Sequence, residues 1–177
     1  MARQLLLDNK MFKNSKLFFG GEYLKNSNPK TARPISVKNA MHVVLRSSHA
    51  KKQLSFLSKS RCFKIQSIIN KQAKKFNIKI YSKSINSNHI HLLIKLNTRD
   101  SFSKFIKVIT SRIACITMGV KKGKAKYLKF WDSRPYSRII SWGKAFTKAK
   151  EYVEKNILEA CGMIEYYRPT KNKTKVT

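Results

Sequence analysis

The stretch that decides the fold is NHIHLLIKL (residues 88–96), in which two histidines flank an isoleucine and an apolar run follows. Side chains alternate between the two faces of a β-strand, so His89 and His91 point to one face and Ile90 to the other. The run after the histidines is apolar enough for a central strand. We therefore predict a strand over residues 89–96 that presents Ile90 to a helical core and both histidines to the opposite face.

The segments around this strand predict a β-α-β-β-α-β-α order. The predicted strands are residues 41–46, 78–82, 89–96 and 136–140, and the predicted helices are residues 52–76, 102–118 and 142–161. Asn86-Ser87-Asn88 is a turn signal, and Gly119 is a helix stop. This order predicts an α+β fold, a ferredoxin-like antiparallel sheet with helices on one face plus a closing C-terminal helix.

The chain divides into a central domain and two peripheral segments. Residues 1–36 are predicted to be an N-terminal extension, because Gly20-Gly21 and the prolines at 29 and 34 interrupt regular structure. Residues 37–163 form the predicted domain. Residues 164–177 form a polar, basic C-terminal tail.

The charge of the chain predicts a polyanionic partner. Its 39 Lys and Arg against 8 Asp and Glu give a net charge of +31, which favours nucleic acid. No apolar run approaches the roughly 20 residues of a membrane span, so we expect no membrane partner and a cytoplasmic protein. The acids form no cluster of the kind that holds two catalytic metal ions, which disfavours a two-metal nuclease.

Two groups of residues are candidates for a site. His89 and His91 could bind one divalent ion through their imidazoles, or they could be surface strand residues that contact phosphate. In the last helix, whose predicted core stripe is Phe146, Ala149, Val153, Ile157 and Ala160, Tyr152 and Asn156 lie one turn apart at the edge of the stripe. They could project into one cleft, or they could be a border aromatic and a solvated polar residue.

Together these residues resemble the IS200/IS605-like tyrosine transposases of the HUH type, most closely their REP-associated relatives. The resemblance covers about residues 38–162 and rests on three segments in order: NHIHLLI (88–94), FWDSR (130–134) and YVEKN (152–156). The chain departs from the family at Ser87, where a proline is frequent, and at Ile157, where many REP-associated members have proline. Neither departure removes a reacting group.

The resemblance implies a site and a reaction. His89, His91 and the side-chain oxygen of Asn156 would hold one Mg²⁺ or Mn²⁺, and Tyr152 would attack a DNA phosphate to form a 5′-phosphotyrosine. The enzyme would thus be a transposase that cleaves and rejoins single-stranded DNA, with hairpin-containing element ends as substrates, and it would act as a homodimer. Candidate DNA contacts are Lys121, Lys122, Arg134, Arg138 and Trp131, although core packing is an equal alternative for the tryptophan.

Two other functions stay open from the residues alone. A basic ferredoxin-like domain can bind RNA or DNA without catalysis, as a domesticated relic of a transposase would, but such modules display aromatic side chains on an exposed sheet face. A ribosome-associated basic protein fits the charge, yet it gives the Tyr-x-x-x-Asn helix no role.

Overall fold

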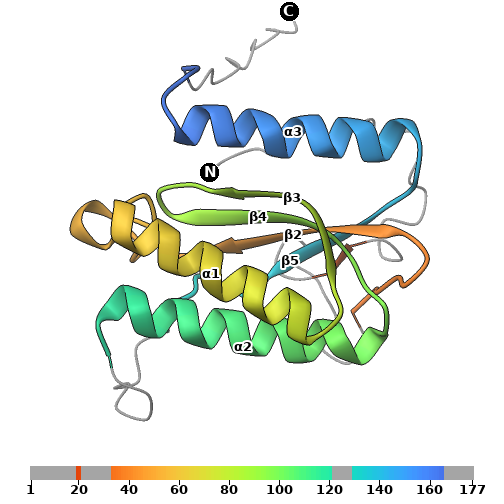
Figure 1. Cartoon of the computed structure of the whole chain (residues 1–177), viewed down its shortest axis with the longest axis horizontal. Coiled ribbons are helices and arrows are strands. Elements are labelled where there is room, and N and C mark those ends of the chain that lie inside the picture. The colour runs from red at the N-terminus through yellow and green to blue at the C-terminus, as the bar shows by residue number, and fades with distance from the viewer. Residues whose placement is uncertain (1–18, 21–32, 121–128, 166–177) are drawn as a thin grey trace, which may run out of the picture.

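The computed structural model describes residues 19–20, 33–120 and 129–165. These residues form a five-stranded antiparallel sheet with helices on both faces (Figure 1). The strands are β1 (Phe19–Gly20), β2 (Ala40–Arg46), β3 (Lys79–Ile85), β4 (His89–Lys95) and β5 (Tyr136–Ile140), and the helices are α1 (Lys59–Lys75), α2 (Arg99–Met118) and α3 (Lys144–Ala160). The strand order is β1-β5-β2-β4-β3, which confirms the predicted ferredoxin-like α+β fold.

The predicted histidine strand is β4, and it lies in the interior of the sheet between β2 and β3. Its register with β2 places His91 opposite Val44 and Leu93 opposite His42. On the other side, Ser84 of β3 lies opposite His91. Opposed residues in an antiparallel pair point to the same face, so the register determines which side chains from three strands meet.

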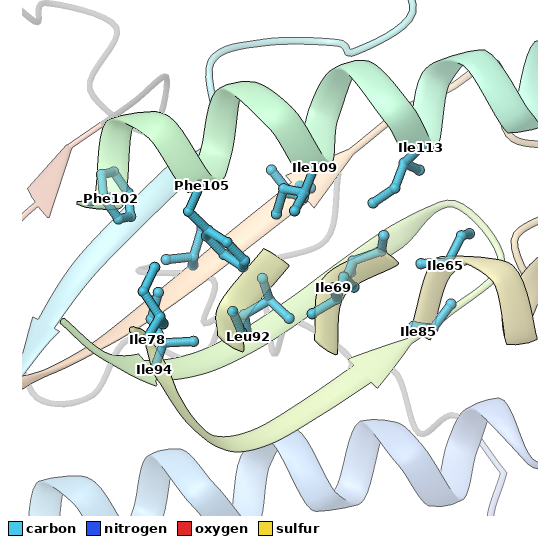
Figure 2. Packing of buried hydrophobic residues seen from close by; sticks show 14 of the residues in the cluster. Ile65, Ile69, Ile78, Ile85, Leu92, Ile94, Phe102, Phe105, Ile109 and Ile113 are labelled. Carbon is cyan, nitrogen blue, oxygen red and sulfur yellow. The ribbon is translucent and has the colours of Figure 1, made fainter. Parts of the chain in front are cut away.

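The main core fills the space between the sheet and the two helices α1 and α2. Figure 2 shows Ile65 and Ile69 of α1 together with Phe105 and Ile109 of α2 and Leu92 of β4, all fully buried. Burying a side chain of this kind contributes about 1.5–3 kcal/mol. This layer therefore supplies most of the apolar burial that stabilises the domain.

Helix α2 begins and ends where its sequence dictates. The Thr98 side chain accepts a hydrogen bond from the Ser101 backbone N–H at 3.2 Å, which satisfies one of the free donors of the first turn. Gly119 ends the helix in the left-handed conformation, with φ of 64°, as predicted. Although α2 has 20 residues, neither it nor any other helix in the described part of the chain is long and apolar enough to cross a membrane.

Helix α3 packs on the opposite face of the sheet, across β3, β4 and β5 (Figure 1). A small apolar cluster holds it there, made of Ala40, Leu93, Ile140, Ala149 and Val153. The predicted stripe is confirmed at its centre, but the next buried position is Asn156 and not Ile157, which is half-buried. The alternative in which Asn156 is a solvated polar residue is therefore wrong.

The first helix begins later than predicted. Within residues 52–76, a 3₁₀ turn occupies Lys52–Leu54 and α1 begins only at Lys59. Between them Phe56 is fully buried, and its backbone N–H donates to the Ser87 carbonyl at 2.8 Å. Because this tertiary bond holds the backbone at Phe56 against the β3–β4 turn, a continuous helix through this point is excluded.

The segment before residue 37 also contributes to the fold. We expected no regular element there, but Phe19–Gly20 (β1) pairs with β5 and forms one edge of the sheet. Arg33 donates from Nη1 to the Pro135 carbonyl at 2.5 Å and to the Ser137 hydroxyl at 2.8 Å. The domain boundary near residue 37 stays a prediction.

Candidate functional site

The alternation of β4 separates its side chains as predicted. Ile90 and Leu92 are fully buried in the main core, and His89 and His91 lie on the face covered by α3. The two imidazole rings are edge to face, with centroids 4.9 Å apart. Two imidazoles on one face and this close together are in reach of a common ligand.

A third histidine, His42 of β2, joins them. Its Nε2 lies 3.0 Å from Nδ1 of His91, and the two rings are nearly parallel, with centroids 5.2 Å apart and 11° between their planes. Sequence reasoning missed this residue. Its position between Met41 and Val43 in a predicted strand shows that it faces away from the core, but the sequence does not show which strand pairs with β2.

Helix α3 brings the predicted tyrosine and asparagine to the same histidines. The Tyr152 ring stands edge-on to both His91 and His42, at centroid distances of 5.5 and 5.9 Å. Asn156 is 7% exposed, and its Nδ2 donates to the Tyr152 carbonyl at 2.7 Å. The amide nitrogen is thereby used within the helix, and the amide oxygen is the end that can serve a ligand. The Asn156 side chain is also close enough to His89 to raise the pKa of that histidine.

Burial keeps all three histidines uncharged near neutral pH. Desolvation, with the charge of Arg138 as a second cause, lowers the pKa of His42 to about 4. Desolvation and the charge of Arg46 lower the pKa of His89 to about 4, against an opposing effect of the Asn156 hydrogen bond. The pKa of His91 is lowered well below its usual value by desolvation and by its two histidine neighbours. A neutral imidazole has one nitrogen lone pair, which is the form that binds metals.

The hydrogen bonds of His89 select which nitrogen carries that lone pair. Its Nδ1 lies 2.8 Å from Oδ1 of Asn88, and its Nε2 lies 3.1 Å from Nδ2 of Asn86. An amide oxygen only accepts and an amide nitrogen only donates. The hydrogen is therefore on Nδ1, and the lone pair is on Nε2.

The Nε2 atom of His91 indicates whether a metal ion fits this site. This atom is buried and has no hydrogen-bond partner among the described residues. Such a group costs roughly 1–3 kcal/mol, and a bound ion would offset that cost. No cluster of three or more His, Cys, Asp or Glu side chains arranged for a metal occurs in the described ranges. Two imidazoles and the Asn156 oxygen suit Mg²⁺ or Mn²⁺ with water completing the coordination.

The other residues that were predicted to contact DNA do not all lie at this site. Arg138 of β5 lies opposite His42, on the histidine face. Arg134 is exposed and lies close to Arg33, whose pKa is lowered by desolvation and, as a second cause, by the charge of Arg134. Trp131 packs against the main core, and its indole N–H donates to the Thr110 carbonyl at 3.1 Å. Lys121 and Lys122 lie outside the described residues.

One more cation at the site was missed by sequence reasoning. Arg46, at the end of β2, lies opposite His89 and forms an ion pair with Asp132 at 3.6 Å. The Asp132 carboxylate also accepts a hydrogen bond from the Ser48 backbone N–H at 2.6 Å. Because the Arg46 side chain is half-exposed, its guanidinium is available to a phosphate beside the histidines.

Comparison with known proteins gives a family and a fold. The family described as "Transposase IS200 like" matches residues 36–156. Among solved structures, the chain is similar to a REP-associated tyrosine transposase bound to a REP hairpin, at 16% identity and a TM-score of 0.58 over 77% of this chain and 76% of that one. It is also similar to a protein of Deinococcus radiodurans R1 assigned as a transposase, at 14% identity and a TM-score of 0.46 over 72% and 97%. No curated protein matched the sequence.

Proposed function

The chain belongs to the family of IS200-like transposases, and on that basis we propose that it cleaves and rejoins single-stranded DNA through a covalent bond between Tyr152 and a 5′ phosphate. One observation carries the proposal. A tyrosine and an amide from α3 meet two strand histidines on a single face of the sheet, with the Tyr152 ring against His91 and the Asn156 side chain close enough to His89 to affect the pKa of that histidine. Two pairs of residues that lie about 60 positions apart along the chain thus form one site.

Tyr152 is the nucleophile of this reaction. Its phenol oxygen would form a bond to phosphorus while the bond from phosphorus to the 3′ oxygen breaks. The phenol loses one proton and the departing 3′ oxygen gains one, so the products are a 5′-phosphotyrosine and a free 3′-OH. Attack by another 3′-OH reverses the step and restores the tyrosine. The ester keeps the energy of the phosphodiester bond, and rejoining therefore needs no ATP.

The residues around Tyr152 bind and orient the reacting phosphate. Nε2 of His89, Nε2 of His91 and the oxygen of Asn156 would hold the ion. When bound, Mg²⁺ or Mn²⁺ supplies Lewis-acid stabilisation of the charge that develops on phosphate oxygens. The hydrogen bond from Asn156 Nδ2 to the Tyr152 carbonyl keeps the amide oxygen turned away from the helix backbone. Arg46 and Arg138 add positive charge on the same face.

The DNA partner is inferred from charge and from the similar structure. A net charge of +31 predicts strong and salt-dependent binding to a phosphate backbone. The similar REP-associated transposase is bound to a REP hairpin, and we extend this partner to the present chain as a hairpin beside the cleaved strand. The RNA-binding alternative is disfavoured, because α1 and α2 cover one face of the sheet and α3 packs on the other (Figure 1).

A trapped covalent intermediate tests the proposal. Single-stranded oligonucleotides that cover the DNA on either side of the gene are incubated with the protein and Mn²⁺, and protein–DNA adducts that survive SDS are measured. The wild type should form an adduct and Tyr152→Phe should form none. Tyr81→Phe is the matched control, because Tyr81 also contacts α3, through Phe146, but its ring contacts among the described residues are with Trp142 and Phe146 and not with the histidines. An adduct that persists in Tyr152→Phe would falsify the assignment of the nucleophile.

A further inference from the structure

Among the buried polar side chains at the site, that of His42 has no part in the proposed reaction. His42 is 4% exposed, and its contacts with His91 and Tyr152 place it between the sheet and α3. Its Nε2 is engaged with Nδ1 of His91, and that nitrogen is therefore not directed at the ion position. A buried histidine with a single defined polar contact to a ligand histidine needs an explanation beyond packing.

The contact between the two rings permits two arrangements of one hydrogen. Either Nδ1–H of His91 donates to Nε2 of His42, or Nε2–H of His42 donates to Nδ1 of His91. In a neutral imidazole only one of the two nitrogens carries a hydrogen, and the other nitrogen has the available lone pair. Only the first arrangement leaves a lone pair on Nε2 of His91, the buried atom that has no partner among the described residues. The second would place a buried hydrogen there and exclude a metal.

The neighbouring ligand histidine shows the same arrangement with a different partner. Nδ1 of His89 donates to the Asn88 amide oxygen, which leaves the His89 lone pair on Nε2. For both histidines Nδ1 is paired to a protein group. Nε2 of His91 has no partner among the described residues, whereas Nε2 of His89 lies 3.1 Å from the amide nitrogen of Asn86, which can donate to its lone pair. Ligand histidines in proteins are generally held in this way, by an acceptor bonded to the nitrogen that does not bind the metal.

We propose that His42 is a positioning residue that accepts the Nδ1–H of His91 and so holds the lone pair of His91 on Nε2, ready to bind the divalent ion. This hydrogen bond between nearly parallel rings also restricts rotation of the His91 side chain. This inference rests on the proposed metal role of His91, and His42 itself touches neither the ion nor the DNA. Its contribution is therefore to affinity for the ion and to the tautomer of its neighbour.

The tautomer can be measured without any metal. The chain has four histidines, so the imidazole nitrogens of the ¹⁵N-labelled, metal-free protein can be assigned by NMR with one variant per histidine. We expect His91 to carry its hydrogen on Nδ1 in the wild type. In His42→Phe, which keeps an aromatic ring at this position but removes the acceptor, the hydrogen should move at least partly to Nε2. A wild-type His91 protonated on Nε2 overturns the proposal.

Mn²⁺ affinity provides the second readout, measured by titration with the free ion detected by electron paramagnetic resonance. His42→Phe should bind Mn²⁺ about 10–100-fold more weakly, the usual effect of losing a group that supports a metal ligand. His42→Gln should restore most of the affinity, because its amide oxygen can reach the place of Nε2. Equal Mn²⁺ affinity in the wild type and a folded His42→Phe overturns the proposal.

The two readouts also separate this proposal from the function on which it rests. A wild type with His91 protonated on Nδ1 that binds no Mn²⁺ overturns the metal role and leaves the His42 bond intact. A wild type that binds Mn²⁺ and forms the DNA adduct, but with equal affinity in His42→Phe, overturns the role of His42 and leaves the proposed function. Circular dichroism and thermal unfolding establish that each variant is folded.

Discussion

The two faces of the sheet differ in what they bury. Between the sheet and α1 and α2, large apolar side chains such as Phe105 and Leu92 form a continuous core (Figure 2). Between the sheet and α3, a small apolar cluster is followed by buried polar groups, His42, His91 and Asn156. The same strand supplies both layers by alternation. The first layer provides the burial that stabilises the domain, and this allows the second layer to hold polar groups that folding alone would disfavour.

The largest effect should come from breaking the apolar layer. Phe105→Ala should lower the free energy of unfolding by about 3–5 kcal/mol, the usual cost of removing a buried phenylalanine ring. Phe63→Ala is the matched control, because Phe63 is on the neighbouring helix but is 74% exposed, and it should change stability by no more than about 0.5 kcal/mol. Denaturant unfolding measures both. Similar losses in the two variants would contradict the placement of the core.

Breaking the polar layer should instead remove activity. His91→Ala should reduce Mn²⁺-dependent adduct formation by about 100-fold or more, because loss of a group that only supports a metal ligand already costs about 10–100-fold. Its loss of stability should be smaller than that of Phe105→Ala, since it removes a side chain with a buried unpaired nitrogen. EDTA added to the wild type should have the same effect on activity.

His49→Ala is the control for this variant, because His49 is exposed and stacks on Phe130, away from the other histidines. It should keep both the adduct and its dependence on Mn²⁺. An adduct that forms equally well in His91→Ala, or in the wild type with EDTA, would show that no ion takes part.

The smallest expected effect is on DNA affinity, and it shows which surface of the protein the DNA contacts. Arg138 is on the histidine face, whereas Arg134 lies near Arg33, whose guanidinium stands over Phe102 of α2. Arg138→Gln should weaken binding of a single-stranded oligonucleotide a few-fold and reduce the slope of log affinity against log salt by about 0.7, the value for one lost phosphate contact. Arg134→Gln should change less. Fluorescence anisotropy at several salt concentrations measures both, and the reverse order would move the DNA to another surface.

Departures from the predicted structure occur where long-range contacts override local pattern. The start of α1 was predicted too early because the periodicity of residues 52–58 does not show that Phe56 is inserted into the core and bonded to Ser87. Likewise, helical spacing alone favours Ile157 over Asn156 as the buried position. The sheet surface under α3 is partly polar, and there the amide is buried beside His89.

By itself the sequence determined which residues share a face. His89 and His91 lie together, opposite Ile90, and Tyr152 lies one turn from Asn156, because these relations follow from the local geometry of strands and helices. Only the tertiary structure decided that His42 joins them, since strand pairing and register bring together residues 49 positions apart. It also decided the protonation of the site, because the low pKa values of the histidines come from desolvation under α3 and from neighbouring charges.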